Sequence, residues 1–204
     1  MTELIEEPLP VMEHFYTLQG EGAFSGQAAY FIRLGGCDVG CVWCDVKDSW
    51  NAGTHQKYPV NEIIRWTNTY PAKIAVITGG EPLMYNLESL TKELKNIGFR
   101  THVETSGAYE LSGDFDWICL SPKKFKEPLP GVVSMASELK VIVYNKSDFD
   151  WAETYANQVP SNCLLYLQPE WDRRELMMPL ITQYVKNNPK WRISLQVHKY
   201  LNIP

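Results

Sequence analysis

The sequence has no apolar run that approaches the roughly 20 residues needed to cross a bilayer. Its first eight residues are acidic and lack the basic and apolar regions of a secretory signal peptide. It also lacks an excess of basic residues, because 19 Lys and Arg face 24 Asp and Glu, for a net charge of −5. These absences predict a cytoplasmic protein without a membrane or nucleic-acid partner.

The two separate Cys-x2-Cys pairs that build most structural zinc sites are missing too. The chain has five Cys, and three of them, Cys37, Cys41 and Cys44, share the spacing C-x3-C-x2-C within the loop 37–44. No second Cys-x2-Cys pair or nearby His pair closes a zinc site. A [4Fe–4S] cluster normally takes four Cys ligands, so three predict a cluster with one iron open to another molecule. A zinc site and unliganded thiols remain the alternatives.

The other two cysteines, Cys119 and Cys163, lie within apolar stretches and are predicted to be small core residues. A non-catalytic iron–sulfur electron carrier would instead need one of them as a fourth ligand. That reading predicts that substituting Cys119 or Cys163 destroys the cluster, whereas an open cluster tolerates both changes.

Strand-like and helix-like stretches alternate along the chain, whose 204 residues fit one domain spanning 1–204. Strands are predicted at 28–34, 73–78, 100–104, 116–120, 138–144, 163–167 and 191–197. Helices are predicted at 60–67, 86–96, 148–157 and 170–186. This alternation predicts an α/β fold with a mainly parallel sheet. Six or seven strands are too few for an eight-stranded barrel, so we expect a partial TIM-like barrel.

Polar residues follow one predicted strand after another, at the end where such folds place their active sites. One of these strand ends is Thr78-Gly79-Gly80-Glu81-Pro82. Its two glycines would let the backbone approach a ligand closely, and Glu81 could accept a hydrogen bond from a ligand's ammonium group. An ordinary strand-to-helix turn is the alternative reading of the same residues.

The cysteine triad followed by this Gly-Gly-Glu-Pro segment resembles the radical S-adenosylmethionine (SAM) enzymes. The resemblance implies a [4Fe–4S] cluster on Cys37, Cys41 and Cys44, with SAM bound to the fourth iron. Cleavage of SAM would give a radical that abstracts hydrogen from the substrate. An activating enzyme that plants a radical on a partner protein shares the cysteine motif and is the second hypothesis within this superfamily.

Further segments are similar to the 7-carboxy-7-deazaguanine synthase family. They are Phe15-Tyr-Thr-Leu-Gln-Gly-Glu-Gly22, Phe31-Ile-Arg-Leu-Gly-Gly-Cys37, Glu104-Thr-Ser-Gly107, Ser121-Pro-Lys123 and His198-Lys-Tyr-Leu-Asn-Ile-Pro204. The resemblance implies a lyase that contracts the ring of 6-carboxy-5,6,7,8-tetrahydropterin, with loss of ammonia, in queuosine biosynthesis. It also implies a flavodoxin or ferredoxin as reductant and a homodimer.

The resemblance also implies roles for individual residues. Substrate contacts are implied for Leu18, Gln19, Gly20, Glu21, Arg33, Thr78, His198 and Pro204. Contacts to SAM are implied for Trp43, Gly80, Glu81, Ser106, Ser121, Pro122, Lys123 and Gln168. No side chain is implied to be a catalytic residue, since the radical comes from SAM. Arg33 would pair with the substrate carboxylate, although a structural ion pair would equally explain an arginine on an apolar strand.

One position departs from the family pattern. The family commonly has Asp-Thr or Asp-Ser after the third cysteine, and that hydroxyl binds Mg²⁺, whereas this chain has Asp45-Val46. Valine has no oxygen to offer a hard cation, so the sequence predicts weak or absent Mg²⁺ dependence. Lys47 could supply the positive charge instead, or Asp45 or Asp48 could hold a metal differently.

Overall fold

The computed structural model describes residues 7–204, so most of the acidic segment used above to argue against a signal peptide lies outside the described residues. The strands are β1 (Leu9–Leu18), β2 (Ala28–Leu34), β3 (Lys57–Tyr58), β4 (Ile74–Gly79), β5 (Arg100–Thr105), β6 (Trp117–Leu120), β7 (Glu138–Val143), β8 (Leu164–Pro169) and β9 (Trp191–Ile193). The helices are α1 (Val60–Thr67), α2 (Glu88–Asn96), α3 (Pro130–Val133), α4 (Ser147–Ala156), α5 (Arg174–Asn187) and α6 (Val197–Leu201).

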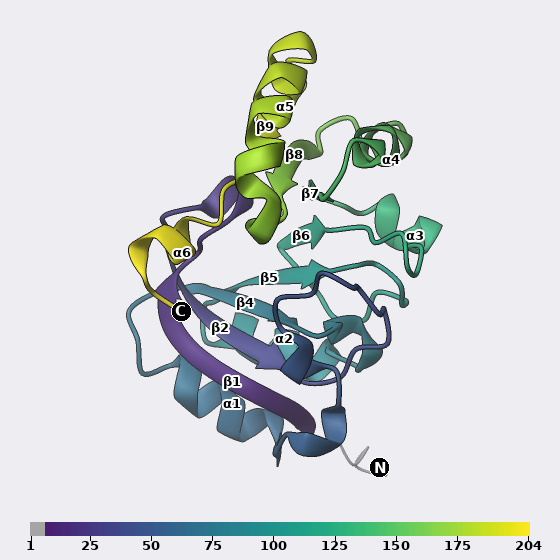
Figure 1. Ribbon diagram of the computed structural model, residues 1–204. Coiled ribbons are helices and arrows are strands. Elements are labelled where there is room, and N and C mark those ends of the chain that lie inside the picture. Colours follow the sequence, from purple (N-terminus) through teal and green to yellow (C-terminus); the bar gives the residue numbers. More distant parts are fainter. Residues whose placement is uncertain (1–6) are drawn as a thin grey trace.

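All nine described strands form one sheet in the order β3-β1-β2-β4-β5-β6-β7-β8-β9. Strand β2 and the strands β4 to β9 pair in parallel. Strand β1 pairs antiparallel with β2 and extends that edge of the sheet, and β3 pairs antiparallel with β1. Figure 1 shows the sheet as a curved row of strands that does not close, with α1 near one end and α5 at the other. The predicted open α/β sheet is confirmed.

The expected strand number was wrong, because the described part of the chain contains nine strands instead of six or seven. Strands β1 and β3 were missed. In β1 only the first three residues are buried, and from Met12 onward the side chains are exposed or partly buried, so the hydrophobic pattern of this strand is weak. The last strand is also shorter than predicted: it ends at Ile193, and the residues from Val197 form helix α6.

The core forms where the apolar sides of the helices pack on the parallel strands. Ile32, Ile77, Leu120, Leu139 and Leu167 come from five of the parallel strands and are completely buried. Such continuous burial is typical of parallel strands that are covered on both faces. No helix in residues 7–204 is both long enough and apolar enough to cross a membrane.

The antiparallel direction of β1 decides where the segment after it lies. Because β1 runs opposite to β2, residues 19–27 lie at the amino ends of the parallel strands. The Phe24 ring packs there, 4.5 Å from the ring of His102 and 4.9 Å from that of Trp117, between their centroids. Residues 19–24 therefore form a floor inside the curved sheet, opposite the cysteine loop that follows β2.

Candidate active site

A cavity of about 430 Å³ opens inside the curve of the sheet, toward the carboxyl ends of the parallel strands. The predicted site residues that line it are Leu18, Gln19, Gly20, Glu21, Arg33, Cys37, Cys41, Trp43, Cys44, Thr78, Gly80, Glu81, Ser106, Ser121, Lys123, Gln168, His198 and Pro204. Pro122 is buried but is not among the lining residues, and its carbonyl accepts a hydrogen bond from Trp151 Nε1 at 3.5 Å.

The cysteine loop lies at the mouth of this cavity. Tyr109 and Lys126 hold the loop through Asp38, whose Oδ2 accepts from the Tyr109 hydroxyl at 2.5 Å and from Lys126 Nζ at 2.9 Å. Burial raises the pKa of the Cys37 thiol and raises that of Cys41 to about 11. Both thiols are therefore protonated at neutral pH unless a metal displaces the proton.

The thiols of Cys37, Cys41 and Cys44 line a shared space without converging on one point. Within residues 7–204, no three Cys, His, Asp or Glu side chains stand close enough to hold a single metal ion. Cys119 and Cys163 lie apart from this loop, buried in β6 and in the main core respectively, as predicted.

Gly79 and Gly80 permit a close approach of β4 to the strand that leads into the cysteine loop. A Cβ atom on Gly79 would lie 2.1 Å from the Leu34 carbonyl oxygen, and one on Gly80 would lie 2.2 Å from that of Gly36. Gly79 also has a φ of +146°, which favours glycine. The two glycines therefore allow the backbone to pass directly beneath the cysteine loop.

The Glu81 carboxylate is completely engaged by its own chain. Oε1 accepts from Leu83 N at 3.1 Å and from Thr105 Oγ1 at 2.5 Å. Oε2 accepts from both the backbone N and the Oγ of Ser106, at 2.7 and 2.5 Å. The side chain is buried. Glu81 thus fastens the end of β4 to the end of β5, and a ligand ammonium group would compete with four donors.

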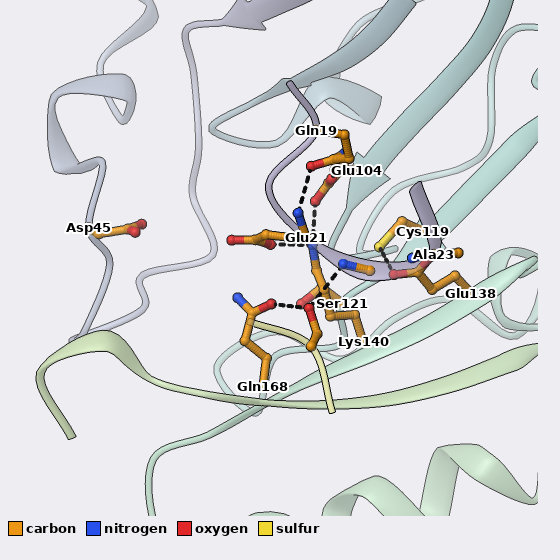
Figure 2. A network of polar contacts seen from close by, with 12 residues as sticks. Gln19, Glu21, Ala23, Asp45, Glu104, Cys119, Ser121, Glu138, Lys140 and Gln168 are labelled. Atoms are coloured by element: carbon orange, nitrogen blue, oxygen red, sulfur yellow. Dashed lines mark hydrogen bonds and ion pairs between the residues drawn. The ribbon is translucent and has the colours of Figure 1, made fainter. Parts of the chain in front are cut away.

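The floor of the cavity carries a network of charged side chains, drawn in Figure 2. Lys140 Nζ, from β7, donates to Glu21 Oε2 at 2.5 Å and to Glu104 Oε2 at 2.7 Å. Gln19 Nε2 donates to the other oxygen of Glu104 at 2.9 Å. Burial raises the pKa of Glu21, but Lys140 and His198 outweigh it and bring the pKa to about 2.

The segment after β9 closes the open side of the sheet next to this floor. Ser194 Oγ accepts from Gly22 N at 3.0 Å, and Val197 N donates to the Gly20 carbonyl at 2.9 Å. In Figure 1, α6 accordingly lies beside the segment that joins β1 and β2. The left-handed conformation of Asn202, with φ of 57°, ends α6 and turns the chain so that Pro204 lines the cavity.

Arg33 is a cavity residue and an ion-pair partner at once. Its Nε donates to Glu13 Oε1 at 2.6 Å across the β1–β2 pair. Its neighbour in the parallel β2–β4 register is Thr78, which also lines the cavity. The structural ion pair, the alternative explanation of Arg33, is therefore present, and the pairing with a substrate carboxylate stays a prediction.

Several residues that shape the cavity were missed. Lys140 and Glu138 lie in the predicted strand 138–144, and the sequence assigned no role to either, nor to Glu104 and Gln196, although Lys140, Glu104 and Gln196 line the cavity. Lys199 was missed too, although its Nζ binds Asp45 Oδ2 at 2.9 Å and so links α6 to the cysteine loop. The sequence of β7 did contain a sign of this role. Glu138 and Lys140 are two residues apart in an apolar strand, so their side chains lie on the same face of the sheet.

The chain is similar over nearly its whole length to known proteins that carry one and the same name. Residues 31–118 match the model of the radical SAM superfamily. A 7-carboxy-7-deazaguanine synthase of Flavobacterium psychrophilum is 57% identical, covering 97% of this chain and 94% of its own length. One from Synechocystis is 49% identical, with 100% and 97% covered.

The chain belongs to the 7-carboxy-7-deazaguanine synthase family.

The fold agrees with this assignment. The crystal structure of QueE from Escherichia coli superimposes with a TM-score of 0.81 at 31% identity, covering 93% of this chain and 94% of the other. Membership in the radical SAM superfamily implies a [4Fe–4S] cluster and SAM. The residues fit both, because three soft thiols line the mouth of a cavity large enough for an additional small molecule. The zinc reading is thereby set aside.

Proposed function

We propose that this chain converts 6-carboxy-5,6,7,8-tetrahydropterin into 7-carboxy-7-deazaguanine in queuosine biosynthesis. Substrate and product differ by one molecule of ammonia, so the net ring contraction needs neither an oxidant nor a reductant. The name shared by relatives that cover nearly the whole chain supports this reaction.

One observation carries the proposal: a single cavity joins the three thiols at its mouth to a polar floor and to Arg33. A radical formed at the mouth would therefore meet a substrate held from below. When bound, the cluster and SAM would supply a radical that abstracts hydrogen from the substrate. The chain's own residues would hold that substrate, exclude water and keep its reacting carbon toward the mouth.

The residues of the lower cavity suit a pterin that carries a carboxylate. Glu13 engages Nε of Arg33, and the terminal guanidinium nitrogens would pair with the substrate carboxylate. Gln19, Glu21 and backbone groups of Leu18 and Gly20 would meet the pterin edge, which has both donors and acceptors.

The wall and mouth of the cavity supply the remaining contacts. Thr78, His198 and the Pro204 carboxylate would complete the substrate pocket. Burial lowers the pKa of His198 despite the opposing effect of Glu21, so its imidazole would be neutral at neutral pH. Contacts to SAM would come from Trp43, Gly80, Glu81, Ser106, Ser121, Pro122, Lys123 and Gln168.

Further parts of the proposal concern the partners of the enzyme. A flavodoxin or ferredoxin would reduce the cluster, and the protein would act as a cytoplasmic homodimer. Mg²⁺ would contribute little, because Val46 lines the cavity with an apolar side chain where the family commonly has a hydroxyl.

The test is anaerobic reconstitution of the cluster, followed by incubation with SAM, a reductant and 6-carboxytetrahydropterin. Mass spectrometry should detect 7-carboxy-7-deazaguanine and one equivalent of ammonia. SAM cleavage without this product would reject the substrate assignment and favour the activating-enzyme hypothesis. An intact cluster that cleaves no SAM would favour the electron carrier.

A further inference from the structure

Four side chains and one backbone N–H group at the floor of the cavity form a closed ring of hydrogen bonds. Lys140 binds Glu104 and Glu21, Glu104 accepts from Gln19, and Gln19 Oε1 accepts from the backbone N of Glu21 at 3.1 Å. Figure 2 shows the Lys140 side chain extending to both Glu21 and Glu104. The ring connects β5 and β7 to the segment after β1.

The ammonium group of this ring lies behind its carboxylates. The Lys140 side chain is 3% exposed, whereas those of Glu21 and Glu104 are 16% and 22% exposed. All three side chains line the cavity. A ligand therefore meets two carboxylates that are more exposed than the ammonium group that binds them both.

The position of the ring also matters for the segment that the substrate would contact. Glu21 lies between Gly20 and Gly22, which are fixed to the segment after β9 by the bonds to Val197 and Ser194. Lys140 supplies the corresponding restraint from β7. Without its charge, Glu21 and Glu104 would repel each other across the floor, and the segment would lose that anchor.

We propose that Lys140 is a positioning residue that binds Glu21 and Glu104 and fixes both carboxylates, so that both can accept hydrogen bonds from the N–H groups of the pterin. This inference rests on the proposed function. It adds a residue that touches the carboxylates instead of the substrate, and it makes the floor selective for ligands that present N–H donors.

The charge balance of the floor supports this role. Burial lowers the pKa of Lys140, but Cys119, Glu104, Glu21 and Glu138 together raise it well above its ordinary value. The other groups that face Glu21 are His198 and Gln196, from the segment after β9, Cys119, in β6, and Lys123, after β6. Removing Lys140 therefore leaves burial as the main influence on Glu21, and burial raises its pKa.

The test compares Lys140→Met with Lys95→Met in the cluster-loaded enzyme. Lys95 is a matched control, because it also lies between two carboxylates, 2.7 Å from Asp114 and 3.2 Å from Asp116, but outside the cavity. In Lys140→Met we expect KM for the pterin to rise about tenfold or more, the factor that one lost charge-assisted hydrogen bond corresponds to. Calorimetry of pterin binding to the SAM-bound enzyme should show the same weakening.

The pH dependence gives a readout that a merely structural role would not change. Pterin binding to the wild type should vary little as the pH falls from about 8 to about 6, because Glu21 stays ionised. In Lys140→Met the raised pKa should make binding weaken over that interval. Lys140→Arg, which retains the charge, should restore the flat profile, and Lys140→Gln provides the uncharged variant if the methionine protein does not fold.

The outcomes separate the two proposals. A wild type that makes no deazaguanine product refutes the proposed function. A wild type that makes it, with Lys140→Met and Lys140→Gln retaining both KM and the flat pH profile, refutes the role of Lys140. SAM cleavage can also be measured in the absence of the pterin, and that reaction does not need the floor. If Lys140→Met lost this cleavage as well, the proposed role of Lys140 would be refuted.

Discussion

Glu81→Gln should destabilise the protein even before any cofactor is bound. In the native protein one carboxylate oxygen accepts a hydrogen bond from Leu83 N, and the other accepts one from Ser106 N. In either orientation of the glutamine amide, its NH₂ group replaces one of these oxygens and faces that backbone N–H. One charge-assisted hydrogen bond is lost and a donor is left buried without an acceptor. Together these effects amount to about 3 kcal/mol, which for a chain of this size lowers Tm by about 6–12 °C.

The assay is thermal unfolding of the metal-free protein, followed by circular dichroism, so that SAM binding plays no part. Glu175→Gln is the matched control, because the Glu175 side chain is 91% exposed and should change stability by less than about 0.5 kcal/mol. The Tm of Ser106→Ala, a variant that retains the backbone donor to Glu81, should fall between those of Glu81→Gln and Glu175→Gln. A Tm for Glu81→Gln within 2 °C or so of the control would show that the four observed hydrogen bonds do not stabilise the fold as reasoned.

Three other predictions concern the mouth of the cavity. Cys41→Ala should abolish cluster assembly, whereas Cys163→Ala should retain it, as measured by iron and sulfide content after anaerobic reconstitution; loss in both would indicate a fourth cysteine ligand. Val46→Thr should create or sharpen a dependence of the rate on Mg²⁺, and a strict requirement in the wild type would contradict the expected effect of valine. Gly80→Ala should lower iron content, because its Cβ would press on the Gly36 carbonyl, and full cluster occupancy would refute that reasoning.

Much of the fold was predictable because hydrophobic stretches of strand length alternate with helical ones. The strand from Ala28 to Leu34 and the helix from Val60 to Thr67 have the predicted bounds. The helix predicted at 86–96 begins two residues later, because Leu87 is the N-cap of α2, although the Asn86 side chain still accepts from Glu88 N at 2.9 Å. The edge strands were not predictable in the same way, because one face of an edge strand pair is partly exposed and its hydrophobic pattern is weak.

The sequence by itself determined the chemistry of the mouth. Three cysteines at fixed spacing, two adjacent glycines after a strand and a valine after the third cysteine are local features, and each can be read without knowing what lies opposite. The direction of parallel strands adds that the residues after them gather at one edge. Nearly all of the residues for which the family resemblance implied a ligand contact line the cavity.

Only the tertiary structure decided the floor. Gln19, Glu21, Glu104 and Lys140 come from three separate parts of the chain, and no spacing rule relates them. They meet because β1 runs antiparallel to β2 and carries the next segment to the amino ends of the strands. Burial then forces the charges of these residues to pair, and that pairing depends on distances in space that the order of residues does not contain.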